Sequence, residues 1–108
     1  MAANVSGSNL NNYTLTDFSF FKLVNSLSGY NITGFAGGVS GRYIVIINNT
    51  SNNQTFQQES TSSVASNRFV LGVANKTIGI NQSLTFIYVT GLTIGTSGQS
   101  RWVLTAST

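Results

Sequence analysis

Asp17 and Glu59 are the only carboxylates in the sequence, which makes them the first residues to test for catalytic chemistry. Two carboxylates can hydrolyse a glycosidic bond when their carboxyl groups lie about 5 to 9.5 Å apart. No motif links these two positions, and several strand-like segments separate them. Histidine is absent and no serine lies in a G-x-S-x-G turn, so a triad would need Lys22 or Lys76 as its base. We therefore expect no enzymatic activity.

The residues that usually hold metals or cofactors are also missing. The sequence has no cysteine and no histidine, which removes disulfides and the common zinc sites. Two carboxylates are too few for calcium, which needs several converging oxygen ligands. The run AGGVSG (36–41) is glycine-rich like a phosphate loop, but it lacks the Lys-Ser/Thr signature and precedes a strand rather than a helix. We expect no metal ion and no cofactor.

Charge is sparse. The 108 residues include five basic and two acidic side chains, for a net charge of +3. The basic residues are spread along the chain, whereas a nucleic-acid site needs a concentrated stripe of Lys and Arg. No segment is long and apolar enough to enter a membrane, and residues 1–4 lack the basic start of a signal peptide. The remaining surface is Asn, Ser, Thr, Gln and Gly, which suits a protein outside the cell or on a particle.

The strongest strand pattern is Tyr43 to Ile47, which follows a glycine-rich turn within GFAGGVSGRYIVIINN (34–49). Four of its five residues are β-branched, which favours an extended backbone. Because successive side chains point to opposite faces of a sheet, the strand is apolar on both faces. We expect both faces to be buried, the second one against a partner subunit.

Two features are interpreted as structural. In AGGVSG, several residues should need the positive φ angles that glycine adopts freely. Glu59 and Arg68 flank a polar loop, ESTSSVASNR, and should form an ion pair that closes it; a ligand site at the mouth of this loop is the alternative. The residues assigned to turns and clamps are Gly37, Gly38, Gly41, Arg42, Glu59, Asn67 and Arg68.

The remaining pattern predicts short strands and no helix. We expect a flexible N-terminal lead or tether at 1–12 and one β-domain at 13–108. Expected strands lie within 13–24, 30–35, 43–47, 55–58, 69–73, 77–80, 83–89, 92–94 and 101–105, joined by Gly and Asn turns. Such spacing is typical of an all-β, antiparallel β-sandwich of jelly-roll-like form with about eight short strands.

Several residues could bind sugars. Tyr30 and Trp102, together with the aromatic run from Phe18 to Phe21, could stack on sugar rings, although aromatic residues in alternating strands are more often core. Asn-X-Ser/Thr sequons occur at several positions, but a chain this rich in Asn, Ser and Thr produces them by composition.

Four elements in order resemble a domain that recurs in tail-fibre, head-fibre and other virion surface proteins of bacteriophages and some large DNA viruses. They are ITGFAGGVSGR leading into IVIINN (32–49), ESTSSVASNRF (59–69), SLTFIYV (83–89) and SRWVL (100–104). The resemblance covers about two thirds of the chain. It implies a compact jelly-roll-type β-sandwich in homotrimeric fibres or spikes. The loop 90–99 departs from it, being longer and more apolar than expected.

Two functions follow as expectations. The first is a non-enzymatic virion surface protein, a homotrimeric fibre, spike or capsid-decorating module that contacts other virion proteins and a host surface glycan. The second is a monomeric carbohydrate-binding module, in which Tyr30 and Trp102 would belong to a row of exposed aromatic residues. Neither function involves nucleic acid or membrane insertion.

Overall fold

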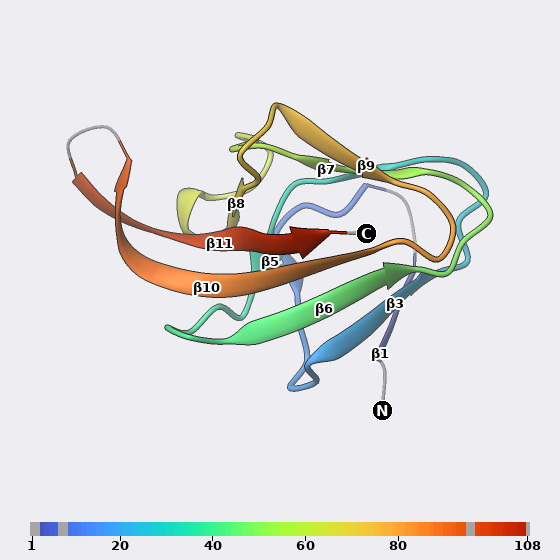
Figure 1. The fold of residues 1–108 in the computed structure, drawn as a ribbon, viewed down its shortest axis with the longest axis horizontal. Coiled ribbons are helices and arrows are strands. Elements are labelled where there is room, and N and C mark those ends of the chain that lie inside the picture. The colour runs from blue at the N-terminus through green and yellow to red at the C-terminus, as the bar shows by residue number, and fades with distance from the viewer. Residues whose placement is uncertain (1–2, 7–8, 95–96, 108) are drawn as a thin grey trace.

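The computed structural model of the protein describes residues 3–6, 9–94 and 97–107 (Figure 1). These residues form strands and one short 3₁₀ helix, η1 (Ala65–Asn67), and none of them lies in an α-helix. The strands are β1 (Ala3–Ser6), β2 (Tyr13–Thr14), β3 (Phe20–Val24), β4 (Asn31–Ile32), β5 (Phe35–Ala36), β6 (Tyr43–Asn48), β7 (Gln54–Gln57), β8 (Phe69–Val70), β9 (Asn75–Ile78), β10 (Ser83–Ile94) and β11 (Ser97–Ser107). The expected all-β class is confirmed.

The strands form three sheets. The largest has the order β1-β3-β6-β10-β11-β8, a second has the order β4-β7-β9, and β2 pairs with β5. In Figure 1 the strands β3, β6, β10 and β11 lie in front of the smaller sheets. The central position of β6, between β3 and β10, agrees with its strongly apolar sequence.

The sheets are mixed, which corrects the expected antiparallel arrangement. Antiparallel pairs join β6 to β10, β10 to β11 and β7 to β9, whereas β1–β3, β3–β6, β11–β8, β2–β5 and β4–β7 are parallel. The chain leaves the large sheet after β1 and β3, passes through the smaller sheets, and returns in the same direction. Parallel neighbours require such crossovers. The strands are also less uniform than expected, because β10 has 12 residues and β11 has 11.

The core lies between the large sheet and the smaller ones. Its centre is a cluster of rings: Phe35 of β5 lies edge-on to Phe69 and Trp102, with centroid distances of 5.0 and 6.3 Å. Phe56 of β7 packs against Phe86 of β10 at 5.7 Å. The indole Nε1 of Trp102 donates to the carbonyl of Phe35 at 3.0 Å, so the polar atom of the buried ring is satisfied.

The N-terminal segment differs from the flexible lead expected for 1–12. Strand β1 pairs with β3 at the edge of the large sheet. Leu10 is buried in the core, and its backbone N–H donates to the carbonyl of Asn31. The side chain of Asn12 accepts hydrogen bonds from the Val64 N–H and the Asn67 amide. Residues 3–6 and 9–12 are therefore part of the domain; residues 1–2 and 7–8 lie outside the described residues.

Strand β6 buries one face fully and the other only in part. Ile44 and Ile46 are buried in the core. On the opposite face Tyr43 is 54% exposed, and Val45 and Ile47 are half-buried. Within a single chain, then, the expectation that both faces are buried is not met. The apolar outer face of β6 is the starting point for the site.

Candidate self-association surface

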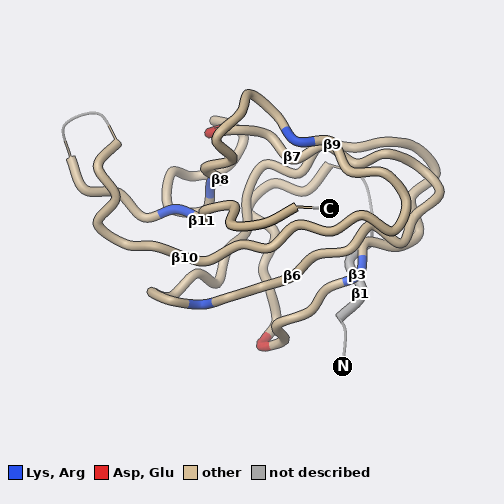
Figure 2. The backbone as a smooth tube through the Cα atoms, in the orientation of Figure 1, with Lys and Arg blue, Asp and Glu red and all other residues tan. Residues whose placement is uncertain are grey.

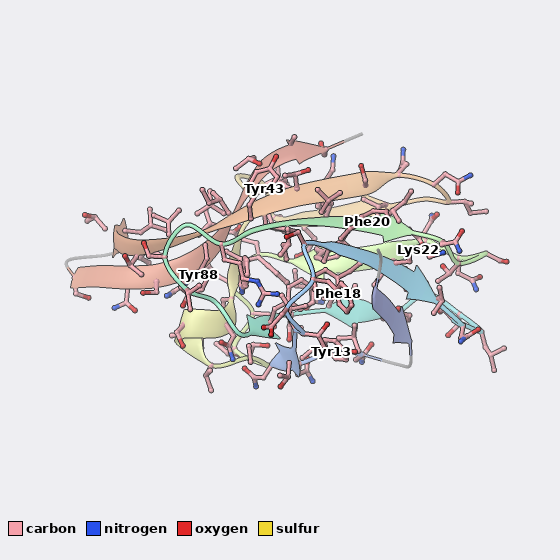
Figure 3. The ribbon with its side chains drawn as sticks, turned by 90° about the horizontal axis from the view of Figure 1, so that it is seen from below. Tyr13, Phe18, Phe20, Lys22, Tyr43 and Tyr88 are labelled. Carbon is pink, nitrogen blue, oxygen red and sulfur yellow. The ribbon has the colours of Figure 1, made fainter. Side chains whose placement is uncertain are left out.

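The outer face of the large sheet carries apolar side chains from three adjacent strands. Val45 of β6 is in register with Phe20 of β3 on one side and with Thr85 of β10 on the other. Tyr43 is in register with Ile87 of β10. Residues in register share a face, so these five side chains form one surface, called here the body patch. In Figure 3, Tyr43 and Phe20 lie along the upper side of the sheet, and Tyr13 lies below it.

A β-bulge carries this face onto the projecting end of the β10–β11 hairpin. Val89 opposes Arg101 and Leu92 opposes Gln99, so β10 contains one more residue than β11 between these pairs. Gly91 has a φ of 73°, in the left-handed region that glycine adopts at no steric cost. Without the extra residue, Leu92 would point to the inner face. The bulge thus keeps Leu92 and Ile94 on the same side as Ile87 and Val89. The short strand expected at 92–94 is present, but residues 90–91 and 97–99 are also strand rather than the expected loop; residues 95–96 lie outside the described residues.

Charge is almost absent from the outer face. Lys22 of β3, in register with Ile47, is half-buried at one end of it. Arg101 also belongs to this face by register, but it is 3% exposed and its guanidinium is held by Glu59. No Asp or Glu lies in the strands that form the body patch. The described part of this surface is therefore mainly apolar, with the half-buried Lys22 at its margin.

The segment before β3 is fixed by Arg42. Its guanidinium donates to the carbonyls of Gly37 at 2.8 Å, Phe18 at 3.0 Å and Thr16. Three acceptors in one planar fork hold the turn after β5 and the segment leading to Phe20 in one arrangement. The position of the segment that leads to Phe20 is therefore fixed within the chain itself.

The glycines of the turn are required for two different structural reasons. Gly37 and Gly41 have φ angles of 102° and 85°, as the expected turn requires. Gly38 does not have a positive φ; instead, a Cβ placed there would lie 2.2 Å from Cε1 of Tyr88. Tyr88 cannot easily move, because its hydroxyl donates to the carbonyl of Ser66 at 2.7 Å and its ring packs against Trp102.

Glu59 is paired with Arg101 and not with Arg68. The Nη2 of Arg101 donates to Oε2 of Glu59 at 3.1 Å, and Nε donates to Oε1. Arg68 instead donates from Nε to the carbonyl of Ser63 at 2.9 Å, inside the polar loop that it was expected to close. Asn67 bonds to Asn12 across the same loop. The loop is thus closed by hydrogen bonds, while the ion pair ties it to β11.

The two aromatic residues considered for sugar stacking are buried. Trp102 is fully buried and Tyr30 is 7% exposed, so neither can present a ring face to a ligand, and their assignment to a stacking site is wrong. The Tyr30 hydroxyl has no hydrogen-bond partner among the described residues. Burial, with a smaller contribution from Tyr13, raises the pKa of this phenol above its usual value of 10.0.

A buried amide network rigidifies the loop end of the molecule. Asn48 is completely buried; its side-chain nitrogen donates to the carbonyls of Asn52 and Ile78, and its oxygen accepts from the backbone and hydroxyl of Thr50. Gln54 donates to the Thr50 hydroxyl at 3.0 Å and accepts from the Tyr30 N–H at 2.8 Å. The sequon at Asn48 is therefore an internal structural element. The loop crosses from β6 in the large sheet to β7 in the three-stranded sheet.

The two carboxylates considered for glycoside hydrolysis do not lie together. Figure 2 shows the only two acidic residues, Asp17 and Glu59, on opposite sides of the body. No cavity is found, and no three His, Cys, Asp or Glu side chains gather in the part of the chain that the structure describes. The same residues include no helix with the length and hydropathy to cross a bilayer.

Comparison of the chain with protein-family models, curated proteins and solved structures finds no match. The site must therefore be judged on its own geometry. Sequence reasoning found the β6 part of the surface and singled out the aromatic run that contains Phe20, although for sugar stacking. It missed Ile87, Val89, Leu92 and Ile94. The signal was present in β10: the residues between Leu84, Phe86 and Tyr88 on its core face are Thr85 and Ile87, and a solvent-facing strand would carry more polar side chains there.

Proposed function

We propose that this protein is a non-enzymatic assembly module that associates with copies of itself through the outer face of its large sheet. The observation that supports the proposal most directly is the body patch: a continuous apolar surface on three central strands, with Tyr43 54% and Phe20 38% exposed. Contiguous exposed apolar patches larger than a few hundred Å² mark interaction sites, so we propose that the body patch acts together with the adjoining outer-face residues Val89, Leu92 and Ile94. A neighbouring copy supplies the same apolar, uncharged surface.

The finer architecture belongs to the same proposal. We infer a β-sandwich, since Phe56 and Phe35 of the smaller sheets meet Phe86 and Trp102 of the large sheet in one core. The antiparallel strands β6, β10 and β11 favour a relationship to the jelly roll. The parallel crossovers through the smaller sheets are where this chain would depart from it.

The biological setting is drawn from the sequence resemblance. A homotrimer on a virion surface, as a fibre, spike or capsid-decorating module that contacts other virion proteins and a host glycan, agrees with the apolar face for association. It also agrees with exposed loops of Asn, Ser and Gln that carry almost no charge. Such a module acts by binding and display, which needs no proton-transfer group.

The test is the mass of the protein in solution. Sedimentation velocity across micromolar to millimolar concentrations should give an oligomer, with three chains of 11.5 kDa as the expected assembly. The double variant Tyr43→Thr and Ile87→Thr replaces a cross-strand pair with polar, β-branched residues that preserve strand preference. It should run as a folded monomer. Val73→Thr, at an exposed apolar position in a loop, is the matched control and should remain associated. A wild-type monomer at every concentration would refute the proposal.

A second candidate function uses the same residues. Tyr43 and Phe20 are exposed aromatic side chains on one face, as a carbohydrate-binding module requires, although Tyr30 and Trp102 are not. Glycan-array binding by a protein that sediments as a monomer, lost in Tyr43→Ala with the melting temperature unchanged, would favour this candidate over self-association.

A further inference from the structure

We propose that the projecting end of the β10–β11 hairpin, called here the arm (residues 90–94 and 97–100), lies on the body patch of a neighbouring copy of this chain. The inference rests on the proposed self-association and says which surfaces meet. Leu92 and Ile94 would contact Tyr43, Phe20 and Val45 of the next copy.

The arm is apolar on one face only. Leu92 and Ile94 are half-buried and oppose Gln99 and Ser97 on the outer face. The inner face of the arm carries Thr93 opposite Gly98, with no large side chain. Figure 1 shows the arm extending away from the rest of the molecule, so no second layer covers it. Leu92 and Ile94 are therefore partly covered within the described chain and keep part of their apolar surface exposed on the outer face of the arm.

The apolar face of the arm cannot contact the body patch of the same chain. Both lie on the same face of one sheet, so their side chains project in the same general direction. Ile87, opposite Tyr43, and Leu92 are separated by about 17 Å of β10 at ~3.4 Å per residue. Both surfaces are therefore available to another molecule at the same time.

The body patch is too small to form a stable interface by itself, so a partner must also contact a neighbouring surface. Three strands spaced ~4.8 Å apart, over about three residues of ~3.4 Å each, project only about 150 Å². A stable interface usually covers about 800 Å² on each partner. The arm is the adjoining apolar surface on the same side, and using it adds contact area without introducing a charge.

A second copy of this chain is the partner that fits both the arm and the body patch. One chain carries both halves of the contact: a narrow aliphatic pair on the arm and a broader aromatic and β-branched surface on the body. Because these are different surfaces, the contact is head-to-tail, and a rotation of 120° between copies closes it into a ring of three. Lys22 lies at the margin of the body patch, where it can keep its charge in water.

Cross-linking between single-cysteine variants tests the contact, with no background because the chain has no cysteine. Leu92→Cys protein is mixed with Tyr43→Cys protein, one of them carrying a mass tag, and treated with a short bis-maleimide. The expected product is the mixed arm–body dimer, formed in excess over either same-site dimer. Thr77→Cys, an exposed position on β9, replaces Tyr43→Cys in the control mixture and should give little product.

A second measurement uses the intact interface. The variant Leu92→Ser with Ile94→Ser should weaken association at least tenfold in sedimentation while the melting temperature of the monomer is unchanged. Thr93→Ser, on the opposite face of the arm, should have no effect. Association of the wild type without an arm–body product, or with only a Tyr43–Tyr43 product, overturns the arm contact and leaves self-association intact. Absence of any association refutes the proposed function itself.

Discussion

Glu59 and Arg101, 42 residues apart in the sequence, form a bidentate ion pair in which Nε of Arg101 donates to Oε1 of Glu59 and Nη2 donates to Oε2. Arg101 is almost completely buried, whereas the Glu59 side chain keeps 26% of its exposure. The pair joins the loop after β7 to the strand that carries Trp102. A desolvated cation depends on its counter-ion, because removing one partner leaves an uncompensated charge.

Glu59→Gln should therefore lower the free energy of unfolding. We expect a loss of about 2 kcal/mol, less than for a fully buried pair because Glu59 is partly hydrated. Urea unfolding at fixed protein concentration measures it. Asp17→Asn removes the other, exposed carboxylate and should change stability by less than about 0.5 kcal/mol. Equal effects of the two substitutions would show that the ion pair contributes nothing specific.

Gly38→Ala should be strongly destabilising although its backbone φ is ordinary. The new methyl group meets the Tyr88 ring, which is held by Ser66 and Trp102. Overpacking of this kind costs about 1 to 3 kcal/mol. Gly98→Ala is the control, since its Cβ would have its nearest neighbour at 3.6 Å. Thermal unfolding compares them; a Gly38→Ala melting curve that matches Gly98→Ala would contradict the close approach.

Tyr30→Phe should stabilise the protein, and more so in alkali. The hydroxyl is buried without a partner, so its removal should gain about 1 kcal/mol at neutral pH. Because burial raises the pKa of this phenol in the folded state, the folded protein holds the proton more tightly than the unfolded chain. Stability is then full below pH 10 and falls as the pH rises through the raised pKa. Urea unfolding from pH 8 to 11 should show a shallower decline in Tyr30→Phe; identical declines would exclude Tyr30 as the cause.

Asn48→Ala should disrupt the loop end. It removes the donor to Asn52 and Ile78 and the acceptor for Thr50, leaving buried groups unsatisfied. The expected loss is about 3 kcal/mol, because each unpaired buried group costs about 1 to 3 kcal/mol. Asn49→Ala, the exposed neighbour, is the control and should be close to neutral. Amide hydrogen exchange at residues 50–54 should rise selectively in Asn48→Ala.

Strand positions could be predicted from the sequence, and their neighbours could not. The β-branched and alternating residues of Tyr43–Ile47 and Ser83–Val89 predict strands there. Pairing depends on which segments meet after a crossover, and no local pattern encodes that. The same holds for Glu59, whose charge predicted a partner but not which arginine. The η1 turn at Ala65–Asn67 carried no signal, since small polar residues also fill irregular loops.

Exposure of the outer face was harder to predict than apolarity. An apolar residue on a sheet face is buried in most proteins, so the pattern of Tyr43, Val45 and Ile47 predicted a burial that the single chain does not provide: Tyr43 is 54% exposed and the other two are half-buried. Leu92 and Ile94 lie beyond a bulge, and a one-residue insertion reverses the face that a period-two pattern assigns. Tyr30 and Trp102 could equally have been core or surface until their contacts were known.

The winding of the chain through alternate sheets has a consequence for how fast the protein folds. Every strand pair except β10 with β11 joins strands that are not consecutive, so most of the ladder must wait for distant segments to meet. Topologies of this kind refold in milliseconds to seconds rather than microseconds. The β10–β11 hairpin can form early, on its own. The sequence lacks proline, so a slower refolding phase could not come from prolyl isomerisation; if the proposed self-association caused it, its rate would depend on protein concentration.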